Sequence, residues 1–325
     1  MGRKLIIFTH GDSDGVSAAA ITIAALRDNY NDIRIYFSHP AGLYGDLNEF
    51  YSNGSDVIVL DIALSELHLE DLLKMFKVIA KKNNLVYIDH HPEPLSIRIK
   101  ELPGQVFHRL DASTSELTYR FFEEYLDSDI VRVALYGAIS DYLDETPWVK
   151  EMLEYWDKRD IYYEAGVLSQ GLEGSRRLHD FKRHVVKHLS ENRLPSSLSE
   201  LLVRALIESV NNEELRKWVK RNVVKRNKFA YVIDPPGSLG RAATYSRAIT
   251  NALVGVAISR RKGLAEMSLR AKRTIVDLNF ILRKIAPRLR GSGGGHSFAA
   301  GARVPLDSLD EFLRELESEL EKIRE

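Results

Sequence analysis

The chain has 325 residues, more than a single hydrophobic core usually holds, so two domains are expected. Its composition, 44% hydrophobic and 28% charged residues, is typical of soluble globular proteins and excludes the disordered and fibrous classes. Because the chain has no cysteine, disulfides, thiolate nucleophiles and cysteine-held zinc are excluded, and any metal must be bound by His, Asp or Glu.

The N-terminal segment "MGRKLIIFTH" has too few consecutive apolar residues for a signal peptide, and no stretch approaches the length of a membrane span. We therefore expect a cytoplasmic protein without membrane contact.

The formal net charge of zero hides an uneven distribution of charge along the chain. Residues 1–145 carry 23 acidic and 13 basic side chains, whereas residues 216–303 carry 3 acidic and 20 basic ones. The basic excess of the second segment predicts an anionic partner for that part of the protein.

Residues 1–146 alternate short apolar runs with segments of helical periodicity. The runs are rich in Ile and Val, which predicts buried parallel strands, and the segments between them predict helices packed on the sheet. The expected strands are 4–10, 33–39, 57–63 and 85–91, and the expected helices are 15–28, 65–82 and one that opens at a capping box of Ser113 and Glu116. This order predicts an α/β fold with a doubly wound parallel sheet, whose ligand site lies beyond the carboxyl ends of the strands.

The rest of the chain divides into a helical connector, residues 147–228, and a smaller α/β domain, residues 229–325. Connector helices are expected at 151–160, 176–189, 198–210 and 212–225, with a break in the Pro- and Ser-rich segment 194–199. The C-terminal domain is expected to have strands at 229–234, 254–261, 265–271 and 297–304, helices at 274–286 and from 309 to the end, and a loop at 291–296.

Acidic residues and histidines stand at the C-terminal ends of the expected strands or directly after them. Parallel strands bring these ends to one edge of the sheet, where several carboxylates would repel one another strongly unless cations lay between them. The residues are His10, Asp12, Asp14, Asp61, Asp89, His90 and His91, and Asp141, after the apolar run of "YGAISDYLD", is a weaker member on local grounds.

Each motif alone has a simpler explanation. Asp-Gly pairs mark turns, so "HGDSDG" on its own fits a bend, and it lacks the later Gly and Glu of an EF-hand loop. Asp61 and Asp141 each fit a cap at a helix end, and "DHH" fits a cap with two surface imidazoles. The motifs in combination favour a metal site.

Imidazoles and carboxylates without sulfur suit manganese, with magnesium, cobalt or zinc as less suitable ions. Two ions bridged by a carboxylate form the clamp that enzymes use for displacement at phosphate esters. A phosphate-containing substrate would also explain the excess of basic residues in the second half of the chain.

The C-terminal domain offers the segment Ser292–His296, "SGGGH", in which three glycines let backbone amides approach an anion closely. A flexible turn between a helix and a strand is the simpler explanation of these glycines. Arg241 and Arg270 are candidate phosphate contacts, and each equally fits a solvated surface charge.

Four motifs in this order, "HGDSDG", "VIVLDIA", "VYIDHHP" and "GAISDYLDE", resemble those of the DHH phosphoesterase family. "MSLRA" followed by "GSGGGHSFAAG" resembles the substrate-binding C-terminal domain of the subgroup that contains RecJ nucleases and nanoRNases. The resemblance spans about residues 5–304, and the ordered set of motifs is specific. The fourth motif departs from the family pattern, since Tyr142 stands where small polar residues are common.

The resemblance implies a role for each matched residue. One manganese ion would be held by His10 and Asp12, the other by Asp14, His90 and Asp141, with Asp61 bridging the two. Asp89 would orient a histidine, and His91 would face the substrate phosphate. Arg270, Gly293, Gly294, Gly295 and His296 would bind the other end of the substrate, across a cleft between the two domains.

The first functional hypothesis is a Mn²⁺-dependent exonuclease, with 3′-to-5′ digestion slightly favoured, acting on single-stranded DNA or RNA or on short oligonucleotides. The basic segment would follow the backbone, and Tyr231, Tyr245 or Phe298 would stack on bases. The alternative is a phosphatase or phosphodiesterase for small nucleotides, such as 3′-phosphoadenosine 5′-phosphate or a cyclic dinucleotide. A non-catalytic replication or repair scaffold is more remote, because the ligand set is complete.

Three expectations about partners and assembly follow. The expected substrate is a single-stranded nucleic acid or oligonucleotide. The charged last helix could bind a replication or repair protein. The sequence leaves open whether the protein forms a homo-oligomer. A solvated amphipathic helix is the simpler explanation of that last segment.

Overall fold

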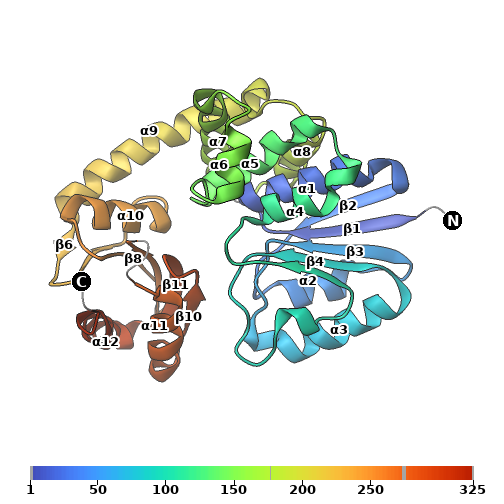
Figure 1. Cartoon of the computed structure of the whole chain (residues 1–325). Coiled ribbons are helices and arrows are strands. Elements are labelled where there is room, and N and C mark those ends of the chain that lie inside the picture. The colour runs from blue at the N-terminus through green and yellow to red at the C-terminus, as the bar shows by residue number, and fades with distance from the viewer. Residues whose placement is uncertain (1–2, 176, 273–275, 324–325) are drawn as a thin grey trace. The chain divides into compact units, whose positions relative to one another are not determined.

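The structure is a computed structural model that describes residues 3–175, 177–272 and 276–323. The chain folds into two compact units, unit 1 (Met1–Glu208) and unit 2 (Ser209–Glu325), and the boundary falls within the long helix α9 (Ser199–Asn222). Figure 1 shows both units and labels their helices and most of their strands. No helix in the described ranges is both long and apolar enough to cross a membrane.

Unit 1 is built on a parallel five-stranded sheet. The strands have the order β2-β1-β3-β4-β5, and each pairs in parallel with its neighbours. They are β1 (Lys4–Thr9), β2 (Asp32–Phe37), β3 (Ser55–Leu60), β4 (Leu85–Asp89) and β5 (Gln105–His108). The predicted doubly wound α/β sheet is therefore confirmed.

Helices cover both faces of this sheet (Figure 1). The helices of unit 1 before the long α9 are α1 (Ser13–Leu26), α2 (Leu43–Phe50), α3 (Leu69–Lys82), α4 (Thr114–Phe122), α5 (Val131–Ser140), α6 (Pro147–Leu153), α7 (Lys158–Glu173) and α8 (His179–Ser190). Successive residues of a strand point to opposite faces, so the strands of unit 1 feed two separate hydrophobic cores. Leu5 and Ile7 of β1 pack with α1, α4 and α5, whereas Ile6 and Phe8 pack with α2 and α3.

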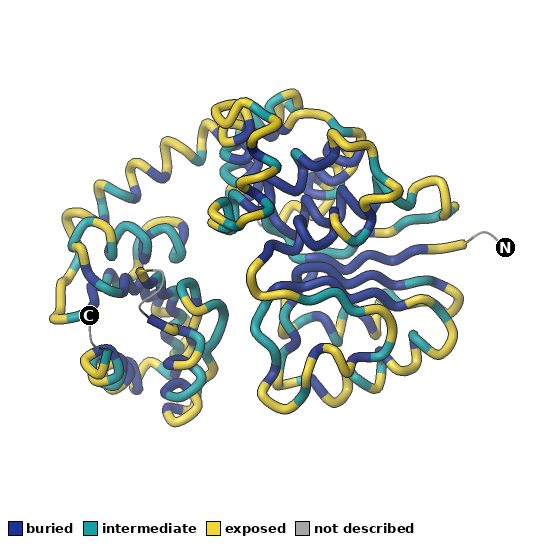
Figure 2. The backbone as a smooth tube through the Cα atoms, viewed as in Figure 1, coloured by how far each residue is buried: buried dark blue, intermediate teal, exposed yellow. Residues whose placement is uncertain are grey.

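The central strands are buried along almost their whole length, as Figure 2 shows in dark blue. Burial on both faces explains why the sequence reads there as continuous apolar runs rather than as alternating ones. The short helix α2 and the edge strand β5 were not predicted. Strand β5 is only partly buried, and its sequence "QVFH" has no such apolar run.

Unit 2 is a six-stranded mixed sheet of order β10-β11-β9-β8-β7-β6. Its strands are β6 (Val224–Lys225), β7 (Phe229–Ile233), β8 (Val254–Arg261), β9 (Leu264–Ala271), β10 (Ser292–Gly295) and β11 (Ala299–Pro305). Its helices beyond α9 are α10 (Leu239–Thr250), α11 (Leu278–Ile285) and α12 (Leu309–Glu321). Helices α11 and α12 pack on one face, and α10 with the C-terminal part of α9 packs on the other.

The final helix is amphipathic, as predicted. The apolar side chains of α12 lie in the core of unit 2, whereas its charged residues remain on the surface. The helix predicted for 274–286 begins at Leu278, and its residues 274 and 275 lie outside the described residues.

Four local predictions were wrong. The helix expected at 151–160 is interrupted between α6 and α7, where Asp157 caps α7 by accepting a hydrogen bond from the Arg159 amide. The two helices expected at 198–210 and 212–225 are the single helix α9. Helix α10 was not predicted, and the segment expected as a loop at 291–296 contains strand β10. The break expected at 194–199 is confirmed, since the turn Pro195–Ser197 separates α8 from α9.

The sequence-based domain limits of 1–146, 147–228 and 229–325 stay a prediction.

Candidate metal centre

The candidate site lies at the carboxyl ends of strands β1, β3 and β4 in unit 1. The sheet order reverses between β1 and β3, because the chain crosses from β1 to β2 on one side and returns to β3 on the other. Ligand sites of parallel α/β sheets lie at this kind of reversal. His10, Asp61 and His90 are each the first residue after one of these strands.

The loop after β1 is shaped by Asp12 and Gly15. One oxygen of Asp12 caps α1 by accepting a hydrogen bond from the Gly15 amide at 3.1 Å, and the other lies 2.6 Å from Nδ1 of His10. A Cβ on Gly15 would collide with the carbonyl oxygen of His10 and lie 2.9 Å from Oγ1 of Thr9. Asp12 is thus both a helix cap and a member of the cluster, and only glycine allows so tight a turn.

Asp14, in the first turn of α1, is fully buried and is held by the beginning of α4. Its two oxygens accept hydrogen bonds from the backbone amides of Thr114 and Ser115, at 2.7 and 2.9 Å. A Cβ on Gly137 of α5 would lie 2.7 Å from Oδ1 of Asp14 and would collide with Oγ of Ser115. Asp14 is therefore fixed from two helices, one of which must carry a glycine.

Asp61 has a left-handed backbone, with φ of 58°, and is 2% exposed. The alternative that it caps a helix fails, since the next helical turn begins five residues later at Glu66. Its Oδ2 lies 3.8 Å from Nδ1 of His10, while its Oδ1 lies 3.4 Å from Nε2 of His90 and accepts a hydrogen bond from the Thr114 hydroxyl. The two oxygens of one carboxylate thus face two different imidazoles.

His90 brings the carboxylates together. Its Nε2 lies 3.3 Å from Oδ2 of Asp141, 3.4 Å from Oδ1 of Asp61 and 3.8 Å from Oδ2 of Asp14. Asp141 stands at the C-terminal end of α5, so it caps no helix N-terminus, and the negative end of the helix dipole disfavours a carboxylate there. A cation among these groups would relieve that cost.

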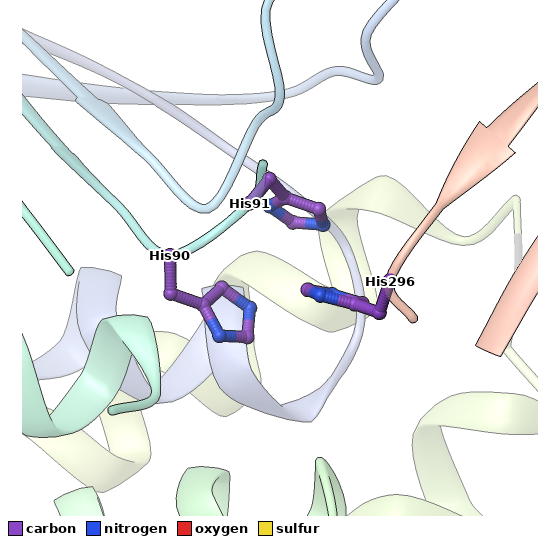
Figure 3. A group of neighbouring side chains, drawn as sticks. All are labelled: His90, His91 and His296. Carbon is purple, nitrogen blue, oxygen red and sulfur yellow. The ribbon is translucent and has the colours of Figure 1, made fainter. Parts of the chain in front are cut away.

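Asp89, which is fully buried, and the half-buried His91 form a second pair beside the cluster. Nδ1 of His91 lies 2.8 Å from Oδ1 of Asp89, and Oδ2 accepts hydrogen bonds from the His91 amide and the Tyr87 hydroxyl. Figure 3 shows the rings of His90 and His91 next to each other at the end of β4, with 4.8 Å between their centroids. The fully buried Asp89 carboxylate therefore fixes the orientation of the His91 ring.

The crowding of charged groups shifts the pKa values of the cluster residues. Burial and the neighbouring carboxylates Asp12 and Asp14 raise the pKa of Asp61, and burial with Asp14 raises the pKa of Asp141 to about 7. The Asp12 carboxylate raises the pKa of His10 to about 9. The pKa of His90 also rises, since the surrounding carboxylates outweigh the opposing effect of burial. Without another cation, the cluster keeps its protons on the imidazoles and on part of its carboxylates.

The donor atoms suit divalent metal ions. His10, Asp12 and Asp61 form one group and Asp14, His90 and Asp141 another, and the ligand atoms of each group lie within 4.8 Å of one another. Carboxylate oxygens with a few imidazole nitrogens favour manganese or magnesium over ions that prefer sulfur. Six of the sequence-predicted residues thus converge in two sets that meet at Asp61.

The structure also shows supporting residues that sequence analysis missed. Thr114 donates a hydrogen bond to Asp61, and Ser115 donates one to Asp14. Gly137 lies beside Asp14. Lys182 of α8 is 6% exposed and donates a 2.5 Å hydrogen bond to the Gly11 carbonyl oxygen. The capping motif at Ser113 predicted where α4 begins. Nothing in the sequence indicated that the amide of the next residue, Thr114, binds Asp14, which is 100 positions away.

Two predicted phosphate-binding arginines lie in unit 2 near the beginning of α10. Arg270 of β9 donates hydrogen bonds to Oγ of Ser268 and to the Leu269 carbonyl, and a Cβ on Gly240 would lie 2.7 Å from its Nη2. Nε of Arg241 is buried and has no hydrogen-bond partner among the described residues. Both side chains therefore lie at the same end of α10.

The glycine run has a packing role in unit 2. A Cβ on Gly293 would lie 3.0 Å from Cβ of Leu282, and one on Gly294 would lie 3.2 Å from Oδ1 of Asn279, so these glycines let β10 lie against α11. The Gly295 amide donates to Asn279 at 3.1 Å, and the His296 ring stacks on Phe298. Anion binding by this segment stays a prediction.

Two other candidates for base stacking are partly buried. Tyr231 and Tyr245 pack against the hydrophobic cores of unit 2, where their rings serve packing.

Comparisons with known proteins find two family domains, and these follow one another in the same order as the sequence motifs. Residues 4–140 match the model of the DHH family, N-terminal domain, and residues 227–322 match that of the DHHA1 domain. No curated protein matches the chain.

Among solved structures, one described as a member of the s1p family of ribosomal proteins, DHH domain, is 17% identical over 99% of this chain and 88% of its own, with a TM-score of 0.75. RecJ from Thermus thermophilus with Mn²⁺ is 16% identical over 100% of this chain, which spans 53% of RecJ, with a TM-score of 0.70. The pGpG-specific phosphodiesterase PggH of Vibrio cholerae is 11% identical over 99% of this chain and 100% of its own, with a TM-score of 0.61. At these identities the likeness concerns the fold.

The position of Gly137 gives a first test of the metal centre. Gly137→Ala places a methyl group against Asp14, so we expect Mn²⁺ to bind about 10- to 100-fold more weakly, as when a metal ligand loses its support. Isothermal titration with Mn²⁺ measures the affinity, and circular dichroism checks that the variant is folded. Gly166→Ala on α7, where a Cβ meets nothing within 4 Å, is the control. Unchanged Mn²⁺ affinity in a folded Gly137→Ala variant would contradict the placement of Asp14 in the site.

The raised pKa values give a second test. At pH 7 the metal-free protein holds a proton on His10 and, on average, part of one on Asp141, whereas metal ligands must be deprotonated. We expect Mn²⁺ binding at pH 7 to release about one proton or more per chain, and the affinity to rise as the pH increases towards 9. Titration in two buffers of different ionisation enthalpy counts the protons. Zero release, with constant affinity between about pH 6 and 9, is the opposing result.

Proposed function

Since the chain belongs to the DHH phosphoesterase family, we propose that it is a Mn²⁺-dependent exonuclease that hydrolyses single-stranded DNA or RNA or short oligonucleotides, with 3′-to-5′ digestion slightly favoured. The observation that carries this proposal is the geometry of Asp61. Its Oδ2 faces His10 and its Oδ1 faces His90, as a carboxylate bridging two ions must.

We assign His10 and Asp12 to one ion and Asp14, His90 and Asp141 to the other, with Asp61 shared. When bound, two divalent ions supply a hydroxide at neutral pH and stabilise charge on the attacking and departing oxygens of a phosphate. In this reaction the oxygen of water would form a bond to phosphorus as the bond from phosphorus to the leaving ester oxygen breaks, and the proton lost by the water would end on that leaving oxygen. Magnesium or cobalt would serve as substitutes for manganese.

Asp89 is a positioning residue in this scheme. Its carboxylate holds Nδ1 of His91 and, together with the Tyr87 hydroxyl, prevents the imidazole from turning. We propose that Nε2 of the oriented His91 contacts a phosphate oxygen of the substrate. Burial would raise the pKa of Asp89, but His91 outweighs it and lowers that pKa, which favours the charged carboxylate that this role requires.

Unit 2 would bind the remainder of the substrate. We propose Arg270 as the phosphate contact there, and Arg241 adds positive charge at the same end of α10. Residues 216–303 carry 20 basic and 3 acidic side chains, which suits a polyanionic chain better than a single phosphate. Gly293, Gly294, Gly295 and His296 remain the proposed contacts to the terminal nucleotide.

A phosphodiesterase for dinucleotides or other small nucleotides is the second candidate. The fold likeness to a pGpG-specific phosphodiesterase, which extends over 99% of this chain and 100% of that one, supports this candidate. A non-catalytic scaffold is less consistent with so many carboxylates and imidazoles kept at one sheet edge.

The bridging role of Asp61 gives a direct test. We expect Asp61→Ala to lower the rate of Mn²⁺-dependent phosphodiester cleavage by about 10³-fold or more, since both ion sites lose a ligand. Digestion of end-labelled single-stranded DNA, RNA and dinucleotides by the wild type and the variant measures the loss. Asp71→Ala, which alters an exposed acidic residue of α3 paired only with Lys74 among the described residues, is the control and should stay active. Full activity of Asp61→Ala would defeat the two-ion mechanism.

The same digestions separate the two candidate functions. Stepwise shortening of an oligonucleotide ladder is expected for the exonuclease. Cleavage restricted to dinucleotides or mononucleotides would replace that proposal with the second candidate.

A further inference from the structure

Tyr142 has an unusual backbone directly after a proposed metal ligand. Helix α5 ends at Ser140, Asp141 follows, and Tyr142 then adopts a left-handed conformation with φ of 59°. The Tyr142 amide donates to the Ile139 carbonyl at 3.0 Å, and the Leu143 amide donates to the Ala138 carbonyl at 2.8 Å. Glycine is the usual residue at this point of such a helix end, because a side chain there is sterically strained.

The strained conformation of Tyr142 does not bury its side chain. The Tyr142 side chain is 61% exposed, so its aromatic ring adds little to the hydrophobic core. The other described non-glycine residues with positive φ are Asp61, Asn192, Asp234, Asn251, Lys262 and Arg290, among which Asp and Asn tolerate this conformation well. Strain that persists without a packing benefit points to a functional role for the side chain.

The strained residue stands beside the metal centre. Adjacent Cα atoms are about 3.8 Å apart, so the ring of Tyr142 starts next to Asp141, whose Oδ2 lies 3.3 Å from Nε2 of His90. A substrate phosphate held at Asp141 would therefore lie next to the chain segment that carries Tyr142.

The segment that carries Tyr142 is held on both sides. The hydrogen bonds at the end of α5 fix its beginning, and Thr146 fixes its end by capping α6. Between them, the hydroxyl of Tyr162 on α7 donates a 2.8 Å hydrogen bond to Asp144. A ring on so restrained a backbone loses little freedom when it binds a flat ligand.

We propose that Tyr142 is a stacking platform for the nucleobase next to the scissile phosphate, and therefore makes the enzyme prefer nucleotide esters to base-free phosphodiesters. The inference rests on the proposed phosphodiesterase function and adds the substrate feature that Tyr142 recognises. Stacking of a base on an aromatic ring is tolerant of sequence, because every base has a π-face. Tyr142 thus contributes binding without selecting one base.

The test compares two single-stranded substrates that differ in one group. One carries a normal nucleotide next to the scissile bond, and the other carries an abasic tetrahydrofuran residue there. We expect Tyr142→Ala to lower kcat/KM about 10-fold or more on the normal substrate and to leave the abasic one within about 2-fold, whereas Tyr142→Phe keeps both activities. Tyr125→Ala, which alters another exposed tyrosine beyond the far end of α4, should change neither.

Tyr142→Gly separates stacking from a structural role. Glycine relieves the left-handed strain, so we expect a higher Tm together with the same base-dependent loss of activity as in Tyr142→Ala. An equal loss on both substrates, or no loss on either, would overturn the stacking proposal while leaving the two-ion mechanism intact. A wild-type enzyme that cleaves neither substrate with Mn²⁺ would overturn the proposed function, and the stacking proposal with it.

Discussion

Repulsion among carboxylates at one edge of a parallel sheet is the constraint on which the rest of unit 1 depends. Asp14 and Asp61 are almost completely buried, and Asp141 lies within hydrogen-bonding reach of the same histidine. Burial of like charges raises their pKa values and costs stability, as the pKa of about 7 for Asp141 illustrates. Among the described residues, the imidazoles of His10 and His90 lie closest to these carboxylates, and a fold that keeps such groups together is organised around positive charge.

The architecture keeps the carboxylates in place from several directions. Asp61 and His90 lie at strand ends, and Asp141 lies at the end of α5. Two backbone amides at the beginning of α4 bind Asp14. Where the backbone must turn most sharply, Gly15 prevents a collision and Asp61 itself takes a left-handed conformation. The residues around the centre are as specialised as the proposed ligands, and most of them are far away in sequence.

Sequence reasoning predicted the parallel sheet and the converging side chains because both follow from local patterns. Continuous apolar runs mark strands buried on two faces, and polar residues directly after them must meet at one edge. It could not find Thr114, Gly137 or Lys182, whose importance comes from contacts across long stretches of chain. In unit 2 it missed α10, whose buried residues are mostly alanines, and it expected a loop where Gly293 and Gly294 form a strand against α11.

The central claim is that a pair of divalent cations lies among these side chains. Anomalous diffraction at the manganese edge, from crystals soaked in Mn²⁺, tests it most directly. Two anomalous peaks are predicted, one beside His10 and Asp12 and one beside Asp14, His90 and Asp141, with a carboxylate oxygen of Asp61 next to each. Side chains splayed apart, with no anomalous density between them, would contradict the account.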